Sequence, residues 1–158
     1  MNKRLGAISQ LIKPQSVVAD IGSDHAFLAI DLLTKREAQH VYNIEINALP
    51  YKNTINNLQK HALLDRTTNI LGNGLQTNAI TQLIDVCVIS GMGGLNMIKI
   101  LSEANPTIKI KQFILMPNNN VIRLRAYLVQ NGYKVIYEEN IIDRKRSYPL
   151  MQIIPIQI

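Results

Sequence analysis

The chain has 158 residues, 47% of them hydrophobic, which suits one domain with a buried core. Seventeen Lys and Arg residues against eleven Asp and Glu give a net charge of +6, which favours RNA, DNA or another anionic partner. The one cysteine excludes an internal disulfide and a cysteine-based zinc site, and no apolar run is long enough to span a membrane. We expect a cytoplasmic protein that is a monomer and holds no metal.

In chain order, apolar runs of strand length alternate with segments of helical periodicity. Strands are predicted at Val17–Ile21, Val41–Ile46, Asn69–Leu71, Val86–Ser90, Phe113–Met116, Lys134–Ile142 and Tyr148–Ile156, and helices at Lys3–Leu11, Ala26–Leu33, Pro50–His61, Ile80–Leu83, Leu95–Ala104 and Val121–Asn131. This alternation predicts an α/β fold with a seven-stranded, mostly parallel sheet and helices on both faces. Because few residues, roughly 143–147, separate the last two strands, these are expected to form an antiparallel hairpin.

The first predicted strand ends in an acid and a single glycine, and a polar cluster follows in the stretch ADIGSDHA (residues 19–26). In an open α/β sheet ligands bind beyond the carboxyl ends of the strands, where Asp20 and Gly22 fall. Ser23, Asp24 and His25 stand where a dinucleotide site has further glycines, and a carboxylate would repel a pyrophosphate. These residues suit a ligand with an ammonium group and no phosphate, such as S-adenosylmethionine (AdoMet). The alternative is that Asp24 only caps the next helix.

The ends of the second and third predicted strands extend this candidate cofactor site. Glu45, followed by Ile46, lies 23 residues after Gly22, a spacing at which an acid accepts hydrogen bonds from ribose hydroxyls. Asn73 and Gly74 are expected at the edge of the adenine, although Asn-Gly is also a common plain turn.

The fourth predicted strand ends in SGMGG (residues 90–94), with three glycines in four residues. Such a run allows close approach of a substrate or of the methionine part of AdoMet, so Gly91, Met92 and Gly93 are candidate cofactor-binding residues. The segment has neither proline nor an aromatic residue. Enzymes that methylate exocyclic amines of adenine or cytosine commonly carry [DNS]-P-P-[YFW] at this position, so that chemistry is disfavoured.

Eight features of the sequence, taken together and in this order, resemble the bacterial tRNA (adenine22-N1)-methyltransferase family, TrmK. They are Arg4-Leu5, ADIGSDHA, Glu45, SGMGG, ILMPN (114–118), LRAYL (124–128), NGY (131–133) and Tyr148. The resemblance runs from Lys3 to about Met151. It implies AdoMet as methyl donor, a class I (Rossmann-like) methyltransferase fold, and methylation of N1 of adenosine 22 in the D-arm of tRNA.

The resemblance also bears on the substrate side. Together with their expected places at strand ends, it makes Asp24, Asn118 and Tyr148 candidates for the target-base pocket, although none need act as a base because the N1 lone pair of adenine can attack directly. His25 could accept a proton near neutral pH, but a cofactor-turn role is preferred. Two arginines match family positions and three basic residues fall in the last hairpin turn, so the candidate RNA contacts are Arg4, Arg125, Arg144, Lys145 and Arg146.

The chain departs from the family at three points. Asn73 replaces the usual aspartate, Pro149 replaces a usual glutamate, and the family's helical C-terminal domain is not expected in this chain, which we predict to be one methyltransferase domain over residues 1–158. The alternatives are a class I methyltransferase acting on another RNA or on a small molecule, and a non-catalytic RNA-binding module that keeps the fold. An NAD-type oxidoreductase is disfavoured by the single glycine and by Asp24.

Overall fold

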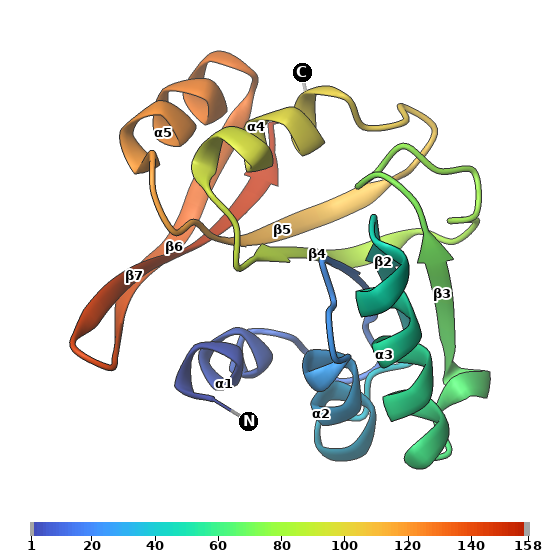
Figure 1. The fold of residues 1–158 in the computed structure, drawn as a ribbon. Helices are drawn as coiled ribbons and strands as arrows, with labels where there is room; N and C mark the ends of the chain where they lie inside the picture. The colour runs from blue at the N-terminus through green and yellow to red at the C-terminus, as the bar shows by residue number, and fades with distance from the viewer. Residues whose placement is uncertain (1, 157–158) are drawn as a thin grey trace.

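One sheet divides the molecule into two layers of helices (Figure 1). The structure, a computed structural model, describes residues 2–156. Within these residues the strands are β1 (Val17–Ile21), β2 (His40–Glu45), β3 (Thr67–Leu71), β4 (Ile84–Ser90), β5 (Ile110–Met116), β6 (Tyr133–Asp143) and β7 (Arg146–Pro155). The helices are α1 (Lys3–Gln10), α2 (Phe27–Lys35), α3 (Ala48–Lys60), α4 (Gly94–Ser102) and α5 (Val121–Gln130), with a short 3₁₀ turn, η1, at Leu64–Arg66.

The strand order β3-β2-β1-β4-β5-β7-β6 confirms the predicted fold class. The first five strands are parallel, and β7 runs antiparallel to both β5 and β6. From β1 the chain builds outward to β2 and β3, and it then returns to the other side of β1 with β4. The turns after β1 and β4 therefore leave the sheet side by side at the position where such sheets bind ligands.

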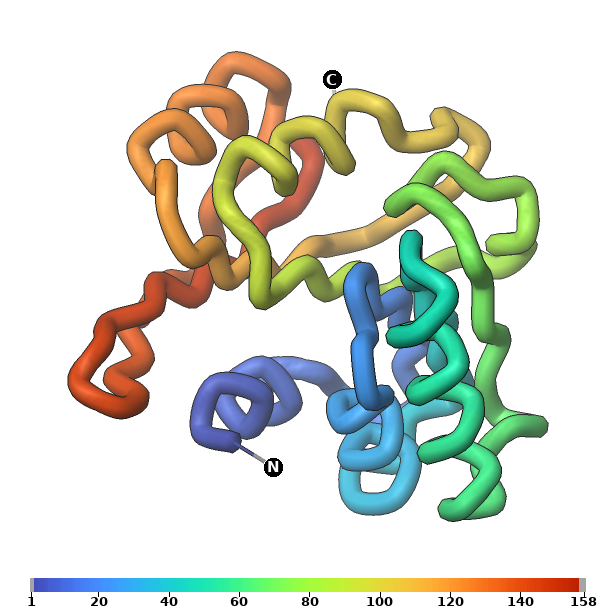
Figure 2. Tube along the Cα trace, viewed as in Figure 1, coloured from blue at the N-terminus to red at the C-terminus, as the bar shows by residue number. Residues whose placement is uncertain are grey.

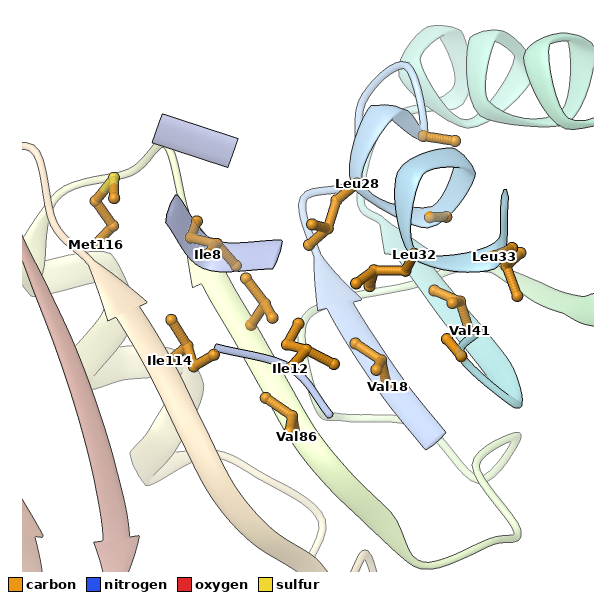
Figure 3. Close-up of a cluster of buried hydrophobic side chains, with 14 of the residues drawn as sticks. Ile8, Ile12, Val18, Leu28, Leu32, Leu33, Val41, Val86, Ile114 and Met116 are labelled. Atoms are coloured by element: carbon orange, nitrogen blue, oxygen red, sulfur yellow. The ribbon is translucent and has the colours of Figure 1, made fainter. Parts of the chain in front are cut away.

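The two faces of the sheet bury separate apolar cores, which explains why the inner strands are almost continuously hydrophobic. On one face, α1, α2 and α3 contribute Ile8, Leu32 and Leu58 to a cluster that includes Val18 and Val86. Figure 3 shows the α1 and α2 part of this cluster packed over β1, β4 and β5. On the other face, α4 and α5 bury their apolar stripes against the sheet, with Met97, Leu124 and Leu128 fully enclosed.

The predicted helix at Ile80–Leu83 is wrong. The segment between β3 and β4 is an irregular loop. Its Ile80 side chain is buried in the core, and Asn105, which follows α4, donates a hydrogen bond to the Thr77 carbonyl of the loop at 3.0 Å. Four residues can close only one helical turn, whose nucleation is costly, so tertiary anchoring decides the conformation.

The β6–β7 hairpin reaches past the carboxyl end of β5 and lies beside α1 (Figure 2). Asp143 pairs with Arg146, which leaves Arg144 and Lys145 as a two-residue turn, shorter than predicted. Both turn residues have positive φ, 52° and 64°, as a type I′ hairpin turn requires. The hairpin thus brings a basic tip to the sheet edge at which β1 and β4 end.

Candidate active site

Two adjoining clefts run along the carboxyl edge of the parallel strands. The first, a cavity of about 250 Å³, lies over β1, β2, β3 and α4 and is lined mainly by apolar side chains, with Glu45 and Asn73 among its polar residues. The second, of about 490 Å³, lies between α1 and the turns after β1 and β4. The two clefts share Gly22, Glu45 and Met92. A ligand lying across these three residues would occupy both clefts.

The boundary between the clefts depends on Gly22. Its φ is +78°, a conformation that L side chains rarely adopt, and a Cβ there would lie 3.3 Å from the Met92 Cε. Gly91 also has a positive φ, +74°, and lines the second cleft. Gly22 therefore allows the turns after β1 and β4 to approach each other, and Gly91 permits the backbone conformation of the turn after β4.

The turn after β1 is held by polar groups from β2 and α3. The Glu45 carboxylate accepts a hydrogen bond from the Asp24 N–H, and the Thr54 hydroxyl donates to the Asp24 carbonyl. The Ser23 hydroxyl faces the Thr54 hydroxyl at 3.3 Å. Ser23 therefore braces the turn with its side chain. These contacts offset the strain of Asp24 and Ala26, which both adopt positive φ.

Asp20 of β1 and Glu45 of β2, beside this turn, form a pair of acids in a low-dielectric environment. Burial, and secondarily the charge of Glu45, raises the pKa of Asp20 to about 7. Burial also raises the pKa of Glu45, although the hydrogen bond from the Asp24 N–H opposes that shift. Within residues 2–156, neither carboxylate has a basic side chain within ion-pair distance. Such acids favour a ligand that brings a positive charge.

A second group of side chains joins α1 to the hairpin at the edge of the second cleft. Arg4 Nε lies 3.1 Å from the Asp143 carboxylate, and the Arg4 guanidinium lies 4.5 Å from the centre of the Tyr148 ring. The Arg146 guanidinium lies 5.2 Å from the same ring and donates to the Asn118 carbonyl at 3.0 Å. The ring of Tyr148 is thus held by two cations.

The structure brings most of the predicted cofactor residues to the two clefts. The first cleft is lined by Gly22, Glu45, Ile46, Asn73, Gly74 and Met92, and the second by Asp20, Gly22, Ser23, His25, Glu45, Gly91 and Met92. Gly93 is placed differently: a side chain there would collide with Asn119, and one on Gly94 would lie 2.7 Å from the Asn120 carbonyl. This pair of glycines lets the turn after β4 pack on the loop after β5.

The predicted substrate residues are more dispersed. Asp24 and Arg4 line the second cleft, and Asn118 and Tyr148 lie beside it, linked through Arg146. Arg125 lies on α5 and its guanidinium forms a bidentate ion pair with Glu138 of β6, so its fork is already occupied. Arg144 and Lys145 lie exposed at the hairpin tip.

Sequence reasoning missed two parts of the site. Helix α4 lines the first cleft with Asn96, Lys99 and Ile100, residues whose helical spacing places them on one face. Phe27, at the start of α2, lines the second cleft with an exposed ring. An aromatic residue in a helical pattern reads as core, so the sequence carried no separate signal for Phe27.

Across the residues that the structure describes, no three His, Cys, Asp or Glu side chains gather closely enough to hold a metal ion. The helices found between residues 2 and 156 are also too short or too polar to cross a membrane.

Comparison with known proteins identifies the family. The methyltransferase domain family matches residues 1–151. M. capricolum TrmK, solved with S-adenosyl-homocysteine, superposes with a TM-score of 0.90 at 31% identity, over 98% of this chain and 69% of that one. The chain belongs to the TrmK family. The resemblance seen in the sequence is confirmed.

Two curated relatives are similar to this TrmK family member over nearly its whole length. The tRNA (adenine(22)-N(1))-methyltransferase of Bacillus subtilis is 28% identical over 152 residues, which are 96% of this chain and 63% of that enzyme. The protein MG248 of Mycoplasma genitalium is 31% identical in an alignment of 159 positions that covers 97% of this chain and 69% of that protein. The chain thus spans about two thirds of the length of these relatives.

Proposed function

We propose that this protein transfers a methyl group from AdoMet to N1 of adenosine 22 in the D-arm of tRNA. The observation that carries the proposal is the pair of clefts that meet at Gly22, Glu45 and Met92, in a chain of the TrmK family. One cleft has the lining expected for a nucleoside, and the other adds acids and a basic rim. The relative from B. subtilis, named for this activity, supports the choice of base and position.

The residues of both clefts fit AdoMet. Apolar side chains and Asn73 in the first cleft would hold the adenine, and Glu45 at the shared boundary would accept hydrogen bonds from the ribose hydroxyls. Asp20, buried without a basic partner among residues 2–156, would face the ammonium or sulfonium charge. When bound, AdoMet supplies an electrophilic methyl group on its sulfonium.

The chain's part in the transfer is to orient the base and to tolerate a cation. The lone pair on adenine N1 forms the new bond to the methyl carbon while the bond to sulfur breaks, so no proton need leave first. Asp24 lies exposed in the second cleft, where its carboxylate would accept a hydrogen bond from the exocyclic amine and stabilise the cationic product. Holding the reacting atoms in line is the main source of rate.

The basic residues around the second cleft would bind the tRNA backbone. The hairpin tip carries Arg144 and Lys145, both exposed, and Arg4 and Arg146 flank Tyr148 beside the cleft. The target adenosine must leave the folded tRNA core to enter this cleft, as in other enzymes that modify a base. One catalytic domain over residues 1–158, a monomeric state and a cytoplasmic location stay predictions.

The test uses AdoMet carrying a labelled methyl group and two transcripts of one tRNA, with adenosine or guanosine at position 22. The proposal expects label on the adenosine transcript alone, mapped to N1-methyladenosine. Equal labelling of both transcripts would exclude position 22 as the target. AdoMet binding with no label on either would contradict the assigned tRNA activity and favour another RNA, a small molecule or a non-catalytic module.

A further inference from the structure

An exposed aromatic pair stands at the rim of the second cleft. Phe27 is the first residue of α2, and 51% of it is exposed, whereas the chain's other phenylalanine, Phe113, is buried. The Phe27 ring stacks on that of His25, with 5.2 Å between centroids and 25° between planes. Exposing a large apolar ring forgoes the free energy that its burial would contribute. A ring left in solvent beside a cleft is therefore a candidate contact for a ligand.

The backbone sets the geometry of this pair. Ala26, between the two rings, is fully buried and has a φ of +60°, so the chain folds back and places residues 25 and 27 together. Asn57 of α3 donates a hydrogen bond to the His25 carbonyl at 2.9 Å, and the Asp24 carboxylate lies 3.7 Å from His25 Nε2. The stack is therefore preorganised before any ligand arrives, which lowers the entropic cost of binding.

The position of Phe27 indicates what it would contact. It lines the second cleft together with Arg4 and Asp24, and it also lines a groove between α2 and α3. A polynucleotide whose target base enters the cleft must carry the adjoining nucleotide over this rim. Every nucleobase has a flat π-face, and unpaired bases bind proteins largely by stacking on exposed aromatic side chains.

We propose that the Phe27–His25 stack is a platform for the unpaired nucleobase next to the methylated adenosine, with Phe27 as the contacting ring. This inference rests on the proposed tRNA activity and assigns it a further binding residue. The platform would hold the tRNA strand in its opened form while the target base occupies the cleft.

The test compares Phe27→Ala with Phe27→Trp in the full chain. Loss of one stacked base should lower kcat/KM for the tRNA about 5- to 100-fold in Phe27→Ala, while Phe27→Trp should stay close to the wild-type value. The Kd for AdoMet should be unchanged in both. Ile122→Ala on α5, a position that is 85% exposed and lines neither cleft, is the matched control for removing an exposed apolar side chain.

Three results would overturn the inference: full tRNA activity in Phe27→Ala, an equal loss in Phe27→Trp, or a parallel loss of AdoMet affinity. If the wild-type protein methylates no tRNA, the proposed function fails while the platform can still be tested. The readout is then 2-aminopurine placed on either side of adenosine 22, whose fluorescence should fall on binding to the wild type and to Phe27→Trp only. Quenching that persists in Phe27→Ala would exclude the platform.

Discussion

The Cε of Met92 lies 3.3 Å from the point that a Cβ on Gly22 would occupy, so the turns after β1 and β4 touch at the boundary of the two clefts. The two turns follow different strands, so this contact sets the position of the boundary between the clefts. Gly22 serves both the backbone conformation and this close approach.

Gly22→Ala should therefore weaken AdoMet binding. The new methyl group would strain a backbone at φ +78° and press on Met92, at a cost of about 1–2 kcal/mol in unfolding free energy. We expect the Kd for AdoMet to rise at least about tenfold, measured by calorimetry. Adding Met92→Ala should recover part of the affinity, because it removes the crowding and leaves the backbone strain. Full recovery would mean that backbone conformation is unimportant there.

The raised pKa of Asp20 predicts how the stability of the ligand-free protein depends on pH. In the fold this pKa is about 7 against an ordinary 3.8, so the stabilising contribution of the protonated carboxyl is present below about pH 4 and is lost as pH rises through 7. The total change is at most about 4 kcal/mol. Asp20→Asn should thus raise the free energy of unfolding at pH 8 and have little effect at pH 4, measured by urea denaturation at both pH values.

The same Asp20→Asn substitution that raises stability at pH 8 should lower the affinity for AdoMet. A neutral amide offers no charge to the cationic groups of AdoMet, so affinity should fall at pH 8. The wild-type affinity should itself fall as pH drops below 7. A variant that gained both stability and AdoMet affinity would show that Asp20 does not face the cofactor. Asn43→Ala, at the position paired with Asp20 on β2, is a control for disturbing the same strands.

Substitutions at the hairpin tip should raise the stability of the protein and weaken its binding to RNA. Arg144 and Lys145 both adopt positive φ, where Asn and Gly are favoured, so the double substitution Arg144→Asn/Lys145→Gly should stabilise the protein by about 1 kcal/mol. The same change removes two cations and should reduce the slope of log Kd for tRNA against log salt by about 2. Thermal melts and filter binding at several salt concentrations measure the two effects.

The charge-matched control for the hairpin is Lys109→Gln/Lys134→Gln. These two exposed lysines lie at the opposite, amino end of β5 and β6. Their loss should leave the salt dependence near its wild-type value. An equal reduction of the salt slope in both variants would mean that tRNA binding depends on the overall charge of the protein and not on a contact with the hairpin tip.

We expect the aromatic ring of Tyr148, and not its hydroxyl, to contribute to the methylation of tRNA. Two guanidinium groups flank the ring, and no hydrogen bond from its hydroxyl is found within residues 2–156. Tyr148→Phe should keep kcat/KM for tRNA within about twofold, since both cation–π contacts survive. Tyr148→Ala should lower it by about tenfold or more, because Arg4 and Arg146 lose the surface that orients them. Inactivity of Tyr148→Phe in single-turnover assays would instead assign the hydroxyl a direct role.

The fold and several residues that line the first cleft were predictable because their signals are local. Continuous apolar strands, Gly22 after β1 and Glu45 after β2 each mark a position in one stretch of sequence, and the topology then brings them together. The glycines of SGMGG were harder to interpret, since the pattern cannot distinguish a glycine that faces a ligand from Gly93, which faces Asn119.

The substrate side depends on contacts that no local pattern encodes. Arg4 meets Asp143 across 139 residues of sequence, so neither the ion pair nor the shared contact with Tyr148 follows from spacing. Phe27 reads as a core residue of an apolar helix until the left-handed conformation of Ala26 turns its ring outward. Such features need the tertiary structure.

The contact of Arg4 with Asp143 and Tyr148 also fixes an order of assembly during synthesis. The first cleft is built from β1 to β4 and α4, all of which precede the hairpin in the chain and are therefore synthesised before it. The wall of the second cleft joins the first helix to the last strand, so it closes only after β7 has emerged. A nascent chain would thus complete the first cleft before the wall of the second cleft.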